Sequence, residues 1–526
     1  MQKRLLGFSS ALGAVLSAVT VAGVELKKYG AFRPFSWGHL FAGLGLFVLL
    51  AAVYGAALAG LFWLLDRQAA RELKKESLLS RLSGNGFLVF VLLMLCWFPA
   101  FLTFFPGWFS ADSLVQFESF YNEDPYSHHP LLHTALLGFC MVKGIDLHPE
   151  GYATYGVALY TVVQMVLLAA CVSYACWWMR RRHVPVWARL TVTLFFALWP
   201  FYHLWPICAQ KDVLFAGLVL LFCLQLVDVW QFGMKPVRLV FFVIIAVLMM
   251  LFRNNGVYAL AVLIPFAVWW AKGRRIRMGA LLAGCAALYL IVNTTMVTVM
   301  EAQQGSKVEM LSIPLQQMAR TLRDDPEAIE LDEDGVLDTL YHGRNPAELY
   351  HVLIADPVKW EVDYDLLDEN IPALLKLWAR MGVGHLKTYI EAFMAQNLPY
   401  ILPYAEMEFH FDLAVKQPVF FPIEQFCLKP ELYKPYMKYI ETLNVLEIPG
   451  TRLLSDTAFF VWLTLIGLVY AAYRRERGLM MAFGFLLAVW ITCLLGPVAL
   501  FRYMLCVFYT TPVLFAYLMI PGRNVC

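Results

Sequence analysis

The sequence predicts an all-α, polytopic integral membrane protein with about twelve transmembrane helices and a helical domain on its outer face. Of its 526 residues, 60% are hydrophobic and 15% are charged, whereas soluble domains are nearer half apolar and a quarter charged. The mean hydropathy is +0.62. Apolar runs recur along the chain, and one polar stretch between them is longer than any ordinary connection.

Charge, cysteine spacing and motifs exclude several function classes. The formal net charge is +2, and no basic face or tract supports nucleic-acid binding. The 11 cysteines are scattered, mostly in apolar runs, and no CxxC occurs, so neither a zinc site nor a disulfide framework is predicted. Neither GxGxxG nor GxxxxGK[ST] is present, which argues against a nucleotide site.

The predicted spans follow from the apolar runs, because a helix needs about 20 apolar residues to cross the bilayer. They lie near residues 7–24, 39–65, 86–106, 152–178, 187–207, 213–230, 239–252, 257–271, 279–299, 456–472, 479–495 and 503–519. The basic, small-residue-rich N-terminus resembles a signal peptide. We expect an uncleaved anchor instead, because spanning segments follow at once.

Lysine and arginine in the short loops predict the orientation. The segments 66–82, 180–183, 272–277 and 473–478 are basic and share one side with the N-terminus. We therefore expect that side to be the cytoplasm and both termini to lie inside. Lys27, Lys28 and Arg33 are an exception, since they fall in an outer loop.

This topology divides the chain into four parts. Residues 1–85 hold extra N-terminal transmembrane helices, 86–299 hold a transmembrane core whose first outer loop is 107–151, 300–455 form an extracytoplasmic helical domain, and 456–526 hold the C-terminal transmembrane helices. In the outer domain, apolar residues from Leu374 to Met381 recur at helical spacing. That helix either lies flat on the membrane or packs on the membrane domain.

Cations stand at the predicted outer ends of the spans, where the charge rule expects few. They are Lys211, Arg253, Arg320 and Arg502, and their polar neighbours are Gln210, Asp212, Asn254, Asn255, Gln316, Gln317 and Tyr503. Each cation alone is explained as well by snorkelling to lipid headgroups. Four on one side indicate a shared anionic ligand. A phosphate suits them, because arginine binds it bidentately and lysine as a point charge.

The first outer loop places Asp112 directly after a span. Ser113 and Gln116 are spaced as a capping box, in which case Asp112 is only a favourable anion at a helix N-terminus. A second helix is predicted to start at "HHPLLHT", with Pro130 at its first position.

Three histidines, His128, His129 and His133, accompany that second helix. His129 and His133 are four residues apart and share a helix face, so a metal site is possible. It is not indicated, because no HExxH is present and the cysteines lie elsewhere. Capping or hydrogen bonds to a substrate are favoured, and no cofactor is predicted.

Short stretches of the chain resemble a known class of enzyme. "PGWFSADSLVQ", "HHPLLHT", "KDVLF", "FRNNG", "LSIPLQQMAR" and "FRYML", within residues 86–520 or so, are similar to a bacterial polytopic membrane family of unknown function of the GT-C type. The more distant resemblance is to protein O-mannosyltransferases and lipid A aminoarabinose transferases. One departure is that many GT-C enzymes carry paired acids in this loop, whereas here the only adjacent acids, Glu123 and Asp124, come after Asp112.

The resemblance implies a GT-C-like glycosyltransferase in the bacterial cytoplasmic (inner) membrane. Its donor would be a sugar on a polyprenyl phosphate, and its acceptor a cell-envelope glycan, lipid or protein. Asp112 would act as general base, and transfer by single displacement would invert the anomeric centre. The expected contacts to donor and phosphate are Lys211, Arg253, Asn254, Asn255, Arg320, Arg502, Tyr503, His128, His129, His133 and Gln116.

Two other functions stay open. A flippase or transporter of lipid-linked sugars would use the same cations but needs a polar path through the helices, and polar residues within the spans are few, among them Gln164, Gln225 and Asn293. A structural assembly factor would leave the cations without a common site.

Overall fold

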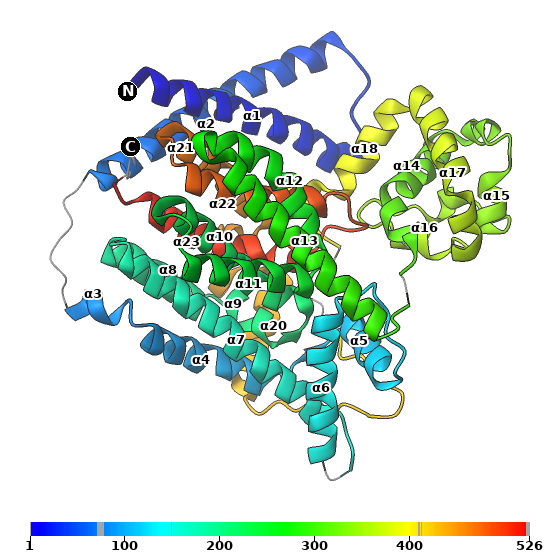
Figure 1. The fold of residues 1–526 in the computed structure, drawn as a ribbon. Coiled ribbons are helices and arrows are strands. Elements are labelled where there is room, and N and C mark those ends of the chain that lie inside the picture. Colours follow the sequence, from blue (N-terminus) through cyan, green and yellow to red (C-terminus); the bar gives the residue numbers. More distant parts are fainter. Residues whose placement is uncertain are drawn as a thin grey trace.

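The computed structural model describes residues 2–70, 78–148, 150–303, 305–408, 411 and 413–521. Helices dominate the fold (Figure 1), and the strands in the described part are two residues long each, β1 (Trp108–Phe109) and β2 (Cys208–Ala209). Eight described helices are long and apolar enough to cross a membrane. They are α1 (Gln2–Tyr29), α2 (Trp37–Ala69), α4 (Gly86–Thr103), α7 (Thr154–Arg181), α10 (Lys211–Phe232), α13 (Arg275–Val299) extended by η2 (Lys272–Arg274), α21 (Thr457–Arg474), and α23 (Leu505–Leu518) extended by η8 (Phe501–Met504).

The remaining apolar runs are helical but fall short of that length. A ninth span forms if α8 (Val186–Leu198) is joined to α9 (Phe201–Leu204) and η1 (Trp205–Ile207) across a bend of 58°. The helices α11 (Pro236–Phe252), α12 (Asn255–Trp270) and α22 (Arg477–Cys493) have 17, 16 and 17 residues. Every predicted span therefore coincides with helix. The protein is a multi-pass membrane protein, but twelve crossings are not shown, because these three helices are shorter than the bilayer core requires.

Helix α10 lies at the centre of the bundle, and its two ends have different surroundings. Near its C-terminal end Arg182 pairs with Asp228, Arg274 donates to the Trp230 carbonyl (2.8 Å), and Arg477 lies over the Trp230 ring. A helix of this length spans about 33 Å. Three of the basic loop segments thus share one end of the bundle, and Lys211 lies at the other.

The outer domain is a separate cluster of helices beside the bundle (Figure 1). Its elements are η3 (Lys307–Leu311), α14 (Ser312–Asp324), η4 (Pro326–Leu331), α15 (Val336–Tyr341), η5 (Pro346–Leu349), α16 (Asp356–Trp360), α17 (Tyr364–Gly384) and α18 (Leu386–Gln396). The short α19 (Leu398–Ile401) ends this chain segment and packs against α21, with Tyr400 in the core of the bundle. Leu374 and Met381 of α17 are buried with Leu315 and Leu340 in the core of this domain. The helix predicted to lie on the membrane or the membrane domain therefore packs inside the outer domain itself.

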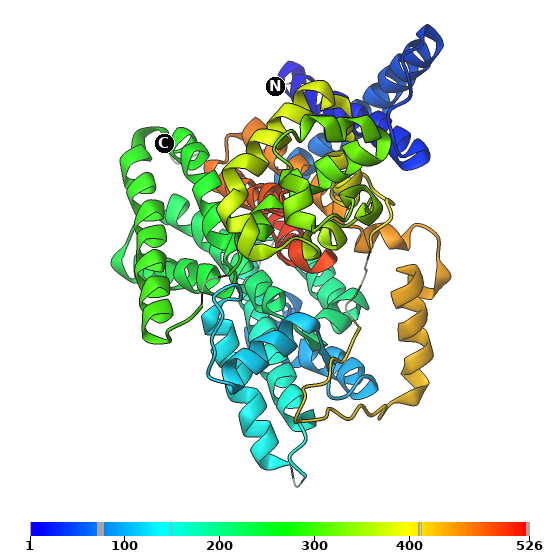
Figure 2. The ribbon, with the colours of Figure 1, turned by 90° about the vertical axis from the view of Figure 1, so that its right-hand side faces the viewer.

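An extended strap connects the outer domain back to the bundle (Figure 2). Its residues 413–429 cross β1 and the turn before it. The Lys416 N–H donates to the Phe109 carbonyl of β1, and the Phe426 N–H donates to the Phe105 carbonyl of the turn (2.8 Å each). The strap leads into α20 (Pro430–Thr442), η6 (Val445–Glu447) and η7 (Thr451–Ser455), while the short α3 (Leu78–Leu82) precedes α4. The strap thus covers the segment that enters the first outer loop.

Candidate functional site

Two matching strand-to-helix units carry the acidic residues of the site. β1 runs into α5 (Ala111–Tyr121) and β2 runs into α10. The strands pair in parallel, with Trp108 opposite Cys208 and Phe109 opposite Ala209. The two helices therefore begin side by side, and Asp112 and Asp212 each lie in the first helical turn. Two helix N-termini, which favour anions, meet at this point.

The entry to the first unit depends on one glycine. Gly107 has φ +113°, and a Cβ there would lie 2.6 Å from Thr161 Oγ1 and 2.8 Å from the Ile207 carbonyl oxygen. No larger residue fits this turn without displacing backbone. The side chain of Ser110 then accepts a hydrogen bond from the Ser113 N–H (3.3 Å) and begins α5.

The predicted helix starts are wrong by a few residues. The helix begins at Ala111, so the capping residue is Ser110 and not Ser113. Gln116 does not complete a capping box, because its amide donates to the Asp112 carbonyl (3.1 Å). Pro130 precedes α6 (Leu131–Leu147) instead of opening it. The cause is that Ser110 and Ser113 are both capping residues, and the strand pairing decides which is used.

Asp112 is held by two cations from distant parts of the chain. Its Oδ2 atom accepts a hydrogen bond from Lys211 Nζ (2.9 Å) and lies 3.2 Å from Arg502 Nη1. The three side chains are 27%, 12% and 13% exposed. Burial raises the pKa of the Asp112 carboxyl, but Arg502 and Lys211 together outweigh burial and hold that pKa well below its usual range. The carboxylate is therefore ionised, and the described part of the chain offers Oδ1 no hydrogen bond.

His129 extends this cluster as a neutral acceptor. Lys211 Nζ lies 3.0 Å from His129 Nδ1. Burial, and then the charge of Lys211, lower the pKa of His129 to about 2. A neutral imidazole nitrogen accepts from an ammonium group, so His129 orients Lys211 without adding charge.

A second ion pair lies beside the first. Arg253 donates to Asp212, and these side chains are 7% and 0% exposed. The Tyr503 ring separates the two pairs, with its centroid 4.4 Å from Arg253 Cζ and 5.2 Å from Arg502 Cζ. Arg253 sits in the break between α11 and α12, and the partly buried Asn254 and Asn255 begin α12. Three cations thus face two carboxylates, which leaves an excess of one positive charge.

His133 and Gln116 are structural residues and not exposed binding groups. His133 is fully buried, and its ring nitrogens lie 2.6 Å from Gln116 Oε1 and 2.6 Å from the Tyr160 hydroxyl. Gln164 continues the network, because its amide donates to the carbonyls of Pro206 (2.9 Å) and Cys208 (2.6 Å). The network connects α5 and α6 to β2 and so fixes the positions of the elements that carry the site. The predicted shared face of His129 and His133 does not form, since only His133 lies in α6.

Arg320 and His128 lie outside the cluster. Arg320 is buried in the outer domain, where it pairs with Asp324 and donates to the Tyr350 hydroxyl (3.3 Å) and the Gly30 carbonyl (3.1 Å). The prediction that Arg320 joins Asp112 is therefore wrong. His128 is exposed and lies edge-on to His129 at 4.9 Å between ring centroids.

Asp212 is the site residue that sequence reasoning missed. In the sequence it stands only as a polar neighbour of Lys211. Its Oδ2 atom is buried and accepts no hydrogen bond from the described residues. A signal was present, because "SAD" and "QKD" each place an acid just after a helix start, but the pairing of β1 with β2 is needed to see that the positions correspond.

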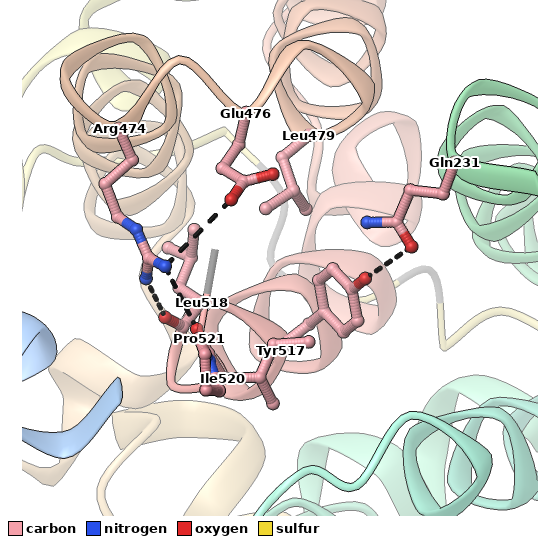
Figure 3. A pocket seen from close by; sticks show the side chains of 8 residues that line it. All are labelled: Gln231, Arg474, Glu476, Leu479, Tyr517, Leu518, Ile520 and Pro521. Atoms are coloured by element: carbon pink, nitrogen blue, oxygen red, sulfur yellow. Dashed lines mark hydrogen bonds and ion pairs between the residues drawn. The ribbon is translucent and has the colours of Figure 1, made fainter. Parts of the chain in front are cut away.

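The described residues provide neither a metal centre nor, in the pocket of Figure 3, a cavity for a large ligand. No group of three or more His, Cys, Asp or Glu side chains in the described ranges is placed to hold a metal ion. The pocket in Figure 3 lies at the opposite end of α10, between Gln231, Arg474, Glu476 and Tyr517. Its volume of about 10 Å³ is near the least that holds one water, so it is not a site for a sugar lipid.

Most of the chain matches a protein-family model. Residues 126–523 match a family described as "Family of unknown function (DUF6020)". No curated protein and no solved structure matches the chain. The match includes Lys211, Arg253 and Arg502 but begins after Asp112.

Proposed function

The chain belongs to the DUF6020 family, and we propose that it is a GT-C-type glycosyltransferase, which moves a sugar from a polyprenyl-phosphate donor to an acceptor at the outer face of the membrane. The observation that carries the proposal is the pair of salt bridges that Lys211 and Arg502 form with Asp112 at one end of the helix bundle. A carboxylate and two cations from three separate segments meet there, and Arg253 supplies a third cation nearby.

The cations and helix ends suit a phosphate. Arg502 and Arg253 carry forked donors for phosphate oxygens, and Lys211 adds a point charge. The N-termini of α5 and α10 contribute partial positive charge in the same place. These groups would stabilise the negative charge that gathers on the departing phosphate.

Asp112 is suited to take the acceptor's proton once the donor is bound. In the resting protein Lys211 and Arg502 hold its pKa low, which makes it a weak base. A donor phosphate would compete for the same two cations, and the pKa of Asp112 would then rise toward its ordinary value. Its Oδ1 atom, which accepts no hydrogen bond within the described residues, would accept the hydroxyl proton.

The proposed reaction is a single displacement. The acceptor oxygen forms a bond to the anomeric carbon while the bond from that carbon to the phosphate oxygen breaks. The electron pair of the broken bond stays on the phosphate, and the proton goes to Asp112. The anomeric centre is inverted, and Asp112 afterwards loses the proton to water.

Transport of the same lipid-linked sugar is the alternative, and it receives less support. Two of the polar residues within the spans are engaged by neighbours. Gln164 is bonded to loop carbonyls, and the Gln225 amide donates to the Tyr174 hydroxyl (3.0 Å). They therefore brace the helices, and neither provides part of a polar path.

The test is a comparison of two lipids that differ only in the phosphate group. Full-length protein in lipid nanodiscs is titrated with a polyprenyl phosphate and with the polyprenol of equal length. We expect the phosphate to bind at least tenfold more tightly, and Arg502→Ala to remove most of this preference. Arg274→Ala, which alters a cation at the other end of α10, is the control and should keep it. Equal binding of both lipids by the unaltered protein would refute the proposal.

A further inference from the structure

The segment that presents Arg502 has no regular structure of its own. Residues 494–500 connect the end of α22 to η8, and Arg502 is the second residue of η8. Backbone N–H and C=O groups outside helices must find other partners, above all near the membrane interior. The partners of this segment therefore decide where Arg502 lies.

The outer domain supplies those partners. The side-chain amides of Asn397 and Gln396 donate to the carbonyls of Leu494 (3.0 Å) and Gly496 (2.7 Å). The Ala355 N–H donates to the Pro497 carbonyl (2.8 Å). Two segments of the outer domain, one at residue 355 and one at residues 396–397, thus converge on one short loop.

Tyr400 makes the contact nearest to Arg502. Its hydroxyl donates to the Leu500 carbonyl (2.8 Å) and accepts from the Leu500 N–H (2.7 Å). Both polar groups of one peptide residue, two positions before Arg502, are held by a single hydroxyl. Tyr400 is fully buried, so water does not replace these bonds when the hydroxyl is removed.

Tyr400 is itself fixed to the membrane helices. Trp490 Nε1 of α22 donates to the Tyr400 carbonyl (3.2 Å), and Trp462 Nε1 of α21 donates to the Ile401 carbonyl (2.8 Å). The indole groups satisfy the end of α19, which has no following turn to do so. The tyrosine ring is therefore a rigid support for Leu500.

We propose that Tyr400 is a positioning residue that holds Arg502 against Asp112 through the backbone of Leu500, with Gln396 and Asn397 as secondary supports. This makes the outer domain part of the site, although none of the residues named in this role touches Asp112. The ligand side of the inference rests on the proposed function, in which Arg502 binds a lipid phosphate.

The experiment combines Tyr400→Phe with Arg502→Ala in the full-length protein. Polyprenyl phosphate is the probe, and hydrogen–deuterium exchange of residues 498–504 is the second readout. Tyr400→Phe should weaken binding about tenfold and speed exchange at Leu500. It should cause no further loss in the Arg502→Ala background, because its effect passes through Arg502.

A matched control separates positioning from general stability. Tyr389 lies in the same domain, and its buried hydroxyl donates to the Trp378 carbonyl (2.8 Å) without touching residues 494–500. Tyr389→Phe should leave both the lipid-phosphate affinity and the exchange of residues 498–504 unchanged. If Tyr400→Phe does not fold, Asn397→Ala takes its place with a smaller expected loss.

Failure of this inference and failure of the proposed function would give different experimental results. Additive losses in the double variant would overturn the inference, and so would an unchanged affinity in Tyr400→Phe. If Arg502→Ala alone leaves the affinity unchanged, the proposed function fails. The positioning role of Tyr400 is then tested by hydrogen–deuterium exchange of residues 498–504 alone. Faster exchange in Tyr400→Phe supports that role, and unchanged exchange overturns it.

Discussion

Asp112 and Asp212 occupy corresponding positions in two parallel strand-to-helix units, each three residues after a paired strand residue. Their partners differ. Asp112 is half-buried and shares two cations, whereas Asp212 is fully buried and pairs with Arg253. Equivalent backbone positions therefore carry one accessible carboxylate and one that fixes an arginine beside it.

Asp112→Asn should reduce sugar transfer by about 10²- to 10⁴-fold, the usual cost of losing a general base. Asparagine keeps the shape of the side chain but does not accept the proton. Binding of polyprenyl phosphate should be intact or tighter, because Lys211 and Arg502 lose a competing anion. Transfer rate and lipid affinity are measured on one preparation. Full activity would move the base to Glu123 or Asp124.

A substitution of Arg253 tests the predicted phosphate contact only when its partner Asp212 is substituted as well. Arg253→Ala alone leaves a buried charge without its partner, which typically costs about 3–5 kcal/mol of stability. The double variant Asp212→Asn/Arg253→Ala should fold better than Arg253→Ala and bind polyprenyl phosphate about tenfold or more weakly than the unaltered protein. Lysine at position 253 should restore only part of the affinity, because the forked geometry is lost.

Thermal unfolding and lipid titration of these variants decide the role of Arg253. A double variant with unaltered affinity would show that Arg253 only caps the break between α11 and α12. Asp212→Asn alone is the control, since it keeps the guanidinium in place.

Arg320→Ala should lower stability without altering the affinity for polyprenyl phosphate. Arg320 and Glu391 are 5% and 4% exposed, and they hold the turn between α1 and α2 through the Gly30 carbonyl and the Phe32 N–H (2.6 Å to Glu391). Removing the guanidinium leaves Glu391 buried with a weaker partner. A lower melting temperature with unchanged lipid affinity is the expected pair of results. Weaker lipid binding in a folded variant would return Arg320 to the site.

Acid should destabilise the protein through its buried histidines. Burial lowers the pKa of His133 to about 3, whereas in the unfolded chain it is near 6.5. The unfolded state therefore binds the proton first, and stability present above about pH 6.5 is lost as the pH falls toward 3. Each such histidine contributes about 1.4 kcal/mol per pH unit in this window.

His133→Gln is the variant that isolates this effect. It should lose stability less steeply than the unaltered protein between pH 6 and about 4.5. Thermal unfolding over a pH series gives the two slopes. Parallel slopes would mean that His133 is not buried in its neutral form.

Local sequence signals predicted the helices well and their capping less well. Each apolar run is helical, because a segment buried in lipid or against neighbouring helices must satisfy its backbone hydrogen bonds internally, and a helix does so. The start of α5 was misplaced, since Ser110 and Ser113 are equivalent as capping residues until Ser113 Oγ bonds the Ala209 carbonyl of β2. The crossing count also exceeds what helix length shows, because α11, α12 and α22 are shorter than a full span, and α11 and α12 are divided by the "FRNNG" break.

The amino-acid sequence alone predicts that Asp112, Lys211, Arg253 and Arg502 stand at ends of apolar segments and, through the basic loops, on one side of the bundle. Those properties depend on hydropathy and charge along the chain. Which cation meets which carboxylate depends on how the helices and loops pack. Arg502 reaches Asp112 because β1 pairs with β2 and Tyr400 holds Leu500, while Arg320 is retained by Asp324 and Glu391 in the outer domain. Ion pairs between distant segments depend on distances that only packing sets.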